Sequence, residues 1–294
     1  MVGKGRKIYV HFKNKNKPLN VATARHRLEE IYENADLYRH IVSPVERPHP
    51  DVDIRYHLIA ISNTRMDSCT PFLLDLLRTY RSNVINKEKT VRLLNELTTL
   101  LVRRKMTERP TTVYDTMFPR LFSMIAGEPD PVRAMQEQFR KNNVWVSDQE
   151  FKESLVERTL YRTRDLIFTR MVLMEIDRTM QTHGQYPDYS TVETIEHVIP
   201  QTLDGHWKEY LGADCDNSKF ETIINSLGNL CLLSGPANSS ASQNPFRAKA
   251  IQYSEVTALA RELKHYEGDW NLAAVRARSE RLADKALVRW AWTL

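Results

Sequence analysis

Apolar residues recur at three- and four-residue intervals over most of the first 180 positions, which is the spacing of one buried helix face. No alternating strand pattern appears before residue 190. The chain is therefore expected to begin with an α-helical domain. Its predicted helices lie at 20–40, 71–81, 87–104, 114–126 and 131–141.

Two local signals subdivide this helical region. A stretch with three prolines at 42–53 cannot form a helix interior, because proline lacks the amide hydrogen and fixes φ. Ser147, with Glu150 three residues later, has the pattern of a helix N-cap and predicts a long helix or a broken pair of helices to about residue 180. A turn-rich segment at 183–190 then ends the helical region.

Strand patterns appear only after this turn. We expect one strand at 191–199 and a second at 227–234, followed by a helix that opens near Asn238. Ser254 and Asn271 are suited to cap two helices near the C-terminus. The predicted fold is therefore mainly α, with a small ββα unit between an N-terminal helical domain and C-terminal helices.

Composition narrows the class of protein. The 294 residues, with 41% hydrophobic and 27% charged side chains, are enough for one large or two modest globular domains. No apolar run approaches the ~20 residues that span a bilayer, so we expect a cytoplasmic protein without a membrane segment. Three cysteines without a CxxC pair argue against a disulfide framework and a cysteine-rich zinc site.

The net charge of +5 comes from one end of the chain. The first 20 residues carry six Lys or Arg and no acid, which leaves 36 basic against 37 acidic residues in the rest. Any DNA-binding face in the body must then arise from the arrangement of charges. The basic leader at 1–19 is open to two interpretations, a DNA-contacting arm or a solvated flexible linker.

Residues 196–238 hold the candidate chemistry. The sequence Glu-His-Val-Ile-Pro at 196–200 is followed by Leu-Gly-Asn-Leu at 227–230 and by Asn238, so Asn229 and Asn238 stand nine positions apart. A lone histidine near a proline would mean little, since histidines are common at structural positions. The whole pattern resembles that of the HNH (His-Me finger, ββα-metal) nucleases.

Each residue type in this pattern suits phosphodiester cleavage. A neutral imidazole, that of His197, can deprotonate water near pH 7. The oxygens of Glu196 and Asn238 suit a hard cation, Mg²⁺ or Mn²⁺, and Asn229 is expected to orient the His197 ring. One objection is geometric, because neighbours on a regular strand point to opposite faces, so Glu196 and His197 should not share a site.

The resemblance extends beyond the motif. The run from 196 to 290 is similar to the C-terminal HNH domain of GmrSD-type modification-dependent restriction enzymes and of SspE-type phosphorothioate-linked phage-defence nucleases. The segments that match are EHVIPQ (196–201), LGNLCLL (227–233), ANSSASQNPFRAK (237–249) and, upstream, the helical run at 145–177. This resemblance implies a metal-dependent DNA endonuclease that nicks one strand at a time, in prokaryotic anti-phage defence or modification-dependent restriction.

Members of that family usually begin with a ParB-like nucleotide-hydrolysing domain. No motif of such a domain, and no phosphate-binding glycine loop, is found in these residues. We therefore expect the chain to be a C-terminal piece whose partner domain precedes it or lies on another polypeptide. Arg247 and Lys249 are candidates for contacts to DNA phosphates, although both also suit a solvated helix surface.

The predicted organisation has three parts: a leader at 1–19, an α-helical connector domain at 20–182, and an HNH nuclease domain at 183–294 with its ββα core at about 191–250. The predicted function is divalent-metal-dependent DNA nicking. Two alternatives stay open: a DNA-binding scaffold without catalysis, and a helical protein-interaction module whose histidine is structural. In both, activity would belong to the nucleotide-hydrolysing domain.

Overall fold

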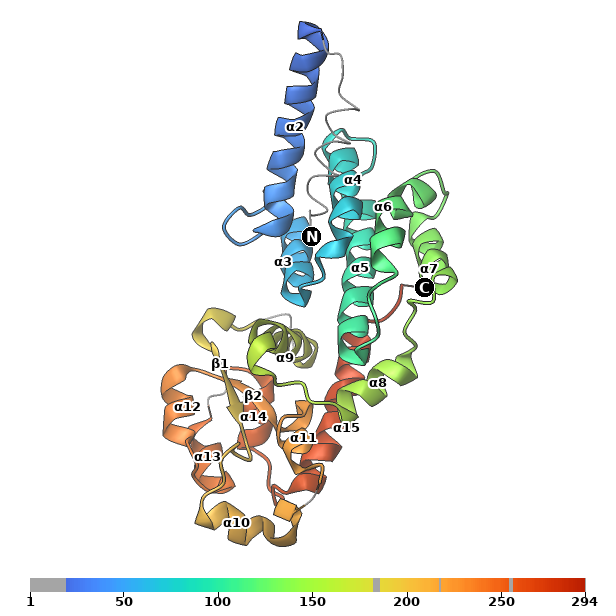
Figure 1. Ribbon diagram of the computed structural model, residues 1–294. Coiled ribbons are helices and arrows are strands. Elements are labelled where there is room, and N and C mark those ends of the chain that lie inside the picture. Colours follow the sequence, from blue (N-terminus) through green and yellow to red (C-terminus); the bar gives the residue numbers. More distant parts are fainter. Residues whose placement is uncertain (1–19, 182–185, 217, 254–255, 294) are drawn as a thin grey trace, which may run out of the picture.

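The computed structural model describes residues 20–181, 186–216, 218–253 and 256–293. The predicted basic leader, part of the predicted turn at 183–190, and the predicted cap Ser254 lie outside the described residues. The described chain is mainly helical, with one antiparallel sheet of two strands (Figure 1). Within the described ranges, no helix is both long and apolar enough to cross a bilayer.

The first part of the chain is a helical bundle, as predicted. It comprises α2 (Val21–Val42), α3 (Val52–Thr64), α4 (Thr70–Arg81), α5 (Lys87–Thr107), α6 (Tyr114–Ile125) and α7 (Pro131–Lys141). Helix α3 was not predicted, because the prolines before it obscured its start. Its N-cap is Asp51, whose carboxylate accepts the backbone N–H of Asp53 (2.9 Å) and of Ile54 (3.3 Å).

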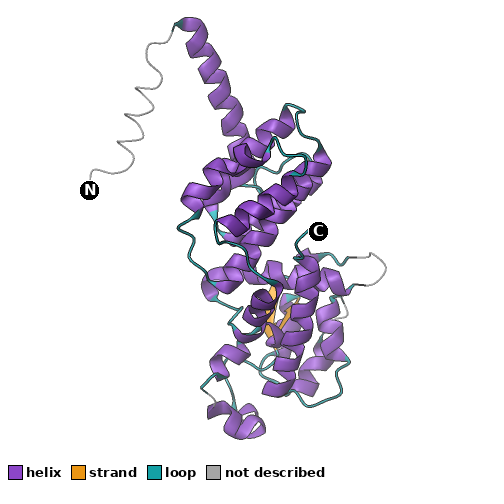
Figure 2. Ribbon diagram, turned by 90° about the vertical axis from the view of Figure 1, so that its right-hand side faces the viewer, coloured by secondary structure: helices purple, strands orange, loops and turns teal. Residues whose placement is uncertain are grey.

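Helix α5 is the centre of this bundle. It packs against α3, α4 and α7 and runs on to reach α8. Its side chains Leu97, Leu100 and Leu101 are fully buried among the aromatic and aliphatic residues of the neighbouring helices. Only the C-terminal end of α2 joins this core, through Leu37 and Ile41, and the rest of α2 extends away from the bundle (Figures 1 and 2).

The predicted helix after Ser147 is a broken pair, α8 (Asp148–Glu157) and α9 (Leu166–Met180). The Ser147 hydroxyl accepts the backbone N–H of Glu150 at 3.2 Å, which confirms the cap. The buried side chains of α8 and α9 belong to a second apolar core, which also contains both strands and the C-terminal helices. This core occupies the lower half of Figure 1.

The two strands are shorter than predicted. Strand β1 covers Thr194–His197 and β2 covers Leu230–Leu233, with Glu196 opposite Cys231 and His197 opposite Leu230. Residues predicted as the start of the second strand form a 3-10 turn instead, η5 (Leu227–Asn229). Helix α12 (Gly235–Ala241) begins three residues earlier than predicted, capped by Ser234.

Helices surround this sheet on several sides (Figure 2). They are α9 and α12, together with α10 (Gly205–Leu211), α11 (Phe220–Ile224), α13 (Phe246–Gln252), α14 (Ala258–Lys264) and α15 (Leu272–Arg289). Asn271 caps α15 as predicted, because its side chain accepts the backbone N–H of Ala274 at 3.0 Å. Helix α15 packs against α8, α9 and η5, and it leads the chain back to the first bundle (Figure 1).

Candidate active site at the end of strand β1

The candidate residues lie where β1 ends. Glu196 meets Lys249 and Tyr253 of the α13 region, whereas His197 meets Tyr161 and Asn225. Side chains of adjacent strand residues point to opposite faces, and these separate sets of neighbours follow that rule. Glu196 and His197 therefore belong to two adjoining clusters.

The Glu196 cluster is a buried ion pair. The Lys249 ammonium lies 2.8 Å from Glu196 Oε1 and donates to the His197 carbonyl at 2.9 Å, while the Tyr253 hydroxyl donates to the same carboxylate oxygen at 3.2 Å. Glu196 is 4% exposed and Lys249 is fully buried. Burial raises the pKa of Glu196 and lowers that of Lys249, and the attraction between the two charges opposes both shifts.

The two residues predicted to contact DNA phosphates both bind other parts of the protein. Lys249 is turned toward Glu196 rather than toward solvent, so its contact with DNA stays a prediction that this arrangement does not favour. Arg247 is exposed, but its guanidinium donates to the backbone carbonyls of Tyr266 (2.7 Å) and Gly268 (3.3 Å). Arg247 thus holds the loop after α14.

Asn225 fixes the tautomer of His197. The Asn225 Nδ2 donates to the carbonyl of Glu221 at 2.9 Å, so its Oδ1 faces His197 Nε2 at 3.1 Å. In the neutral ring Nε2 must then carry the hydrogen and donate it, which leaves the lone pair on Nδ1. Burial lowers the pKa of His197 to about 4, so the ring is neutral at pH 7.

Further contacts hold the same ring. The Tyr161 ring meets it edge-on, with centroids 4.4 Å apart, and Gln201 donates to Asn225 Oδ1 at 2.9 Å. The imidazole is almost enclosed, since His197 is 8% exposed. Neither Asn225 nor Tyr161 was predicted from the sequence. Asn225 stands four residues before the motif asparagine, whereas no local pattern marks Tyr161.

Asn229 acts on the backbone after His197. Its Oδ1 accepts the N–H of Ile199, and its Nδ2 donates to the carbonyls of Ile199 and Ile224, each at 2.8 Å. The predicted contact between Asn229 and the His197 ring is therefore wrong, because Asn225 makes it. Asn229 instead sets the course of the chain two residues beyond the histidine.

The predicted metal ligands do not form an open metal site. Asn238 lies on α12 beside β1, and its Nδ2 donates to the Ile195 carbonyl at 3.5 Å. Mg²⁺ usually keeps several water ligands, and a carboxylate that is 4% exposed and bonded to an ammonium leaves them little room. Across the ranges that the structure describes, no three His, Cys, Asp or Glu side chains gather as metal ligands. The arrangement around Glu196 thus does not fit a hydrated divalent ion.

The region that contains these clusters matches a known protein family. Residues 145–285 match the family model of the C-terminal domain of GmrSD restriction endonucleases. The matched region starts just before α8 and includes both strands and the clusters around Glu196 and His197. No curated protein and no solved structure matches the chain. This region therefore resembles the GmrSD-type C-terminal domain, which indicates a restriction-endonuclease-like defence module.

Proposed function

We propose that the chain is the nuclease module of a prokaryotic anti-phage or modification-dependent restriction protein, and that it hydrolyses DNA phosphodiesters with His197 as general base. The observation that carries this proposal is the bond from His197 Nε2 to Asn225, which leaves Nδ1 as the basic nitrogen of a neutral ring. The family match supports the substrate class.

In the proposed reaction, His197 Nδ1 takes a proton from water, whose oxygen then forms a bond to phosphorus. The bond from phosphorus to the 3′-oxygen breaks, and this oxygen takes a proton from solvent. Asn225 is a positioning residue, because it holds the opposite ring nitrogen and aims Nδ1. A single site of this kind cuts one strand at a time, so the expected product is a nick.

The metal remains a separate part of the proposal. We expect β1, β2 and α12 to be the ββα unit of an HNH nuclease, but the arrangement described above does not fit Mg²⁺ or Mn²⁺ at Glu196 and Asn238. The Lys249 ammonium now occupies one oxygen of that carboxylate, so no step of the reaction above is assigned to a metal.

We also infer where the nuclease unit begins. Helices α8 and α9 bury their apolar side chains in the same core as the strands, and the family match starts at residue 145. Both observations favour a boundary near 145 over one near 183. A ParB-like nucleotide-hydrolysing partner domain stays a prediction.

The decisive experiment is a nicking assay on supercoiled plasmid with Mg²⁺, Mn²⁺ or EDTA. We expect His197→Ala to lower the nicking rate by about 10²–10⁴-fold, the usual effect of removing a general base. Circular dichroism checks that the variant is folded. Nicking at the wild-type rate by His197→Ala would contradict the proposed mechanism.

Asn225 provides a second, independent readout. Asn225→Asp places a negative charge beside His197 Nε2, which raises the pKa of the imidazole. We expect the acid limb of the pH–rate profile to move to higher pH in this variant, whereas Asn225→Leu lowers the rate without that shift. A merely structural asparagine would leave the profile in place.

A scaffold that binds DNA without cutting is the second candidate. The enclosed His197 ring and the paired Glu196 carboxylate favour it, since a catalytic site must admit substrate. Such a protein would bind DNA in a salt-dependent way and leave supercoiled plasmid intact under all three conditions.

A further inference from the structure

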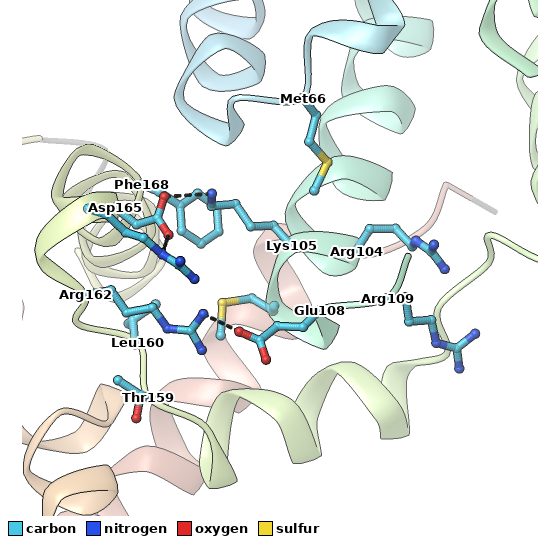
Figure 3. Close-up of a pocket in the computed structure, with 12 residues that line it drawn as sticks. Met66, Arg104, Lys105, Glu108, Arg109, Thr159, Leu160, Arg162, Asp165 and Phe168 are labelled. Carbon is cyan, nitrogen blue, oxygen red and sulfur yellow. Dashed lines mark hydrogen bonds and ion pairs between the residues drawn. The ribbon is translucent and has the colours of Figure 1, made fainter. Parts of the chain in front are cut away.

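A basic cavity lies where the two halves of the molecule meet. It has a volume of about 460 Å³ and is formed by the C-terminal end of α5 and by the segment from 159 to 168. Figure 3 shows Lys105 of α5 facing Asp165, and Glu108, the C-cap of α5, facing Arg162. The volume lies in the range of ordinary ligand sites.

Cations outnumber acids in this cavity. Asp165 is shared by Lys105, at 3.0 Å, and Arg164, at 3.7 Å. Glu108 is likewise shared by two guanidiniums, those of Arg162 and, at 2.7 Å, Arg158. Each of these carboxylates can neutralise one of its two partners, so two of these four positive charges remain uncompensated.

The excess charge is accessible. The side chain of Arg164 is 78% exposed and that of Arg162 is 31% exposed. Burial alone would raise the pKa of Glu108, but the two guanidiniums lower it, so the acid stays ionised and cannot release its partners by protonation. Arg104, also in the cavity wall, donates to the Tyr114 hydroxyl at 3.0 Å and serves the bundle itself.

The cavity wall is connected to the candidate base. Leu160 lines the cavity, and the next residue, Tyr161, packs against the His197 ring. The backbone N–H groups of both residues donate to the Asn225 carbonyl, at 2.9 and 3.0 Å. The cavity and the imidazole are therefore fixed to one another through Asn225.

We propose that this cavity binds the sugar–phosphate backbone of the DNA strand that reaches His197, an inference that rests on the proposed nuclease function. Two phosphates match the two uncompensated cations. The helical bundle then takes part in the site, because Lys105 at the end of α5 pairs with Asp165 and leaves Arg164 free for a phosphate, and the bundle is more than a connector.

A free nucleotide is the other source of the same phosphate chemistry. Among the residues lining the cavity, Phe168 is the one aromatic side chain, and the Lys105 ammonium lies over its ring at 5.0 Å. Phe168 is also 4% exposed, so its face offers no platform on which a base can stack. The cavity therefore suits backbone phosphates better than a base-bearing nucleotide.

The test removes the excess charge and spares the acids. The double variant Arg162→Gln/Arg164→Gln leaves Glu108 paired with Arg158 and Asp165 paired with Lys105. Arg162→Lys/Arg164→Lys keeps the charge. A matched control, Arg81→Gln/Arg133→Gln, removes two ion-paired arginines from α4 and α7, with side chains 38% and 78% exposed. Circular dichroism and thermal melting verify the fold of each protein.

Binding is measured in the full chain by fluorescence anisotropy of a short labelled DNA duplex over a salt series, with EDTA and His197→Ala to prevent cutting. We expect the glutamine variant to bind at least ten-fold more weakly at low salt. The slope of log K against log salt should shrink by about 2, since each phosphate contact contributes ~0.9. The lysine variant and the matched control should keep slopes near that of the parent.

An unchanged slope in the glutamine variant would overturn the proposal. Thermal shifts with ATP or GTP form a second arm. A nucleotide-dependent stabilisation that the glutamine variant loses, with its DNA slope unchanged, would assign the cavity to a free nucleotide and also overturn it. Plasmid nicking with intact His197 is scored separately, so failed cleavage counts against the proposed function while the slopes still report on the cavity.

Discussion

At the scale of single residues, the pair formed by Lys249 and Glu196 combines full burial with opposite charges. Removing one partner of such a pair leaves a charge without compensation inside the protein. We expect Lys249→Met to lower the free energy of unfolding by about 3–5 kcal/mol. Urea titration followed by circular dichroism measures it.

Two further variants control this prediction. Lys249→Met/Glu196→Gln removes both charges and should recover a large part of the loss. Lys152→Met removes a lysine whose side chain is 35% exposed and paired with Asp284, and should cost under about 1 kcal/mol. An equal, small loss at Lys249 and Lys152 would contradict the buried ion pair.

Two buried histidines, His197 and His57 of α3, make the free energy of unfolding depend on pH. Burial lowers the pKa of both His197 and His57 to about 4 in the folded protein, against 6.5 for the free side chain. Between these values the unfolded chain binds more protons than the folded chain, so stability is fully present above pH 6.5 and is lost as pH falls toward 4. Each histidine should cost about 2 kcal/mol between pH 7 and pH 5.

The measurement compares urea unfolding of the wild type and of His197→Asn at these two pH values. On acidification the free energy of unfolding should fall less in the variant than in the wild type, and the difference should equal the contribution of one histidine. Identical losses in the two proteins would mean that the imidazole of His197 titrates as freely in the folded state as in the unfolded chain.

At the scale of elements, the turn η5 depends on the absence of a side chain at Gly228. A Cβ there would overlap the Val275 carbonyl and the Ser279 hydroxyl of α15. The Gly228 N–H donates to that hydroxyl at 2.8 Å, so the backbone of η5 lies directly against α15. We expect Gly228→Ala to destabilise the protein by about 2–3 kcal/mol, as overpacked sites do.

Gly127→Ala is the matched control, because a Cβ at Gly127 meets nothing within 4 Å. Thermal melting of the two variants separates steric overlap from the general effect of replacing glycine, which on its own changes stability by under about 1 kcal/mol. If Gly228→Ala had the same melting temperature as Gly127→Ala, α15 would be able to move aside.

The elements also show what a sequence can predict here. Helices such as α5 were predictable because their 3.6-residue periodicity is strong, and the caps at Ser147 and Asn271 are local signals. The lengths of the strands were not predictable, because they depend on pairing with a strand that is distant in the sequence. In the site, the motif located Glu196 and His197. The partners Lys249 and Tyr161 depend on tertiary packing that leaves no local pattern.

At the scale of the whole molecule, two polar clusters join the bundle to the second core. In one, Tyr56 of α3, Glu175 of α9 and Arg289 of α15 bond to one another. The other is built on Arg103 of α5, which donates to the carbonyls of Trp290 (2.9 Å) and Val146 (3.1 Å) and to Asp148 (2.6 Å). These links hold the two halves in one arrangement.

Arg103 is fully buried, and its guanidinium also lies 5.0 Å from the centres of the Phe151 and Trp292 rings. Arg103→Met keeps much of the volume but leaves the Trp290 carbonyl without its side-chain donor. The Val146 carbonyl loses one of two donors and keeps the Trp292 indole N–H at 3.0 Å. We expect it to lower the free energy of unfolding by about 3 kcal/mol, since each unsatisfied buried group costs ~1–3 kcal/mol. Arg276→Met, whose side chain is 61% exposed and ion-paired with Glu157, should cost under about 1 kcal/mol.

The same variant tests whether the junction couples the two cores. Each half has its own apolar core, so the halves can unfold separately once their link is weakened. Urea unfolding of Arg103→Met, followed by tryptophan fluorescence and by circular dichroism, should show two transitions that do not coincide, where the wild type shows one. Because the basic cavity is built from both halves, Arg103→Met should also bind DNA more weakly than the wild type. Coincident transitions with wild-type affinity would show that the Glu175 cluster alone suffices to hold the halves together.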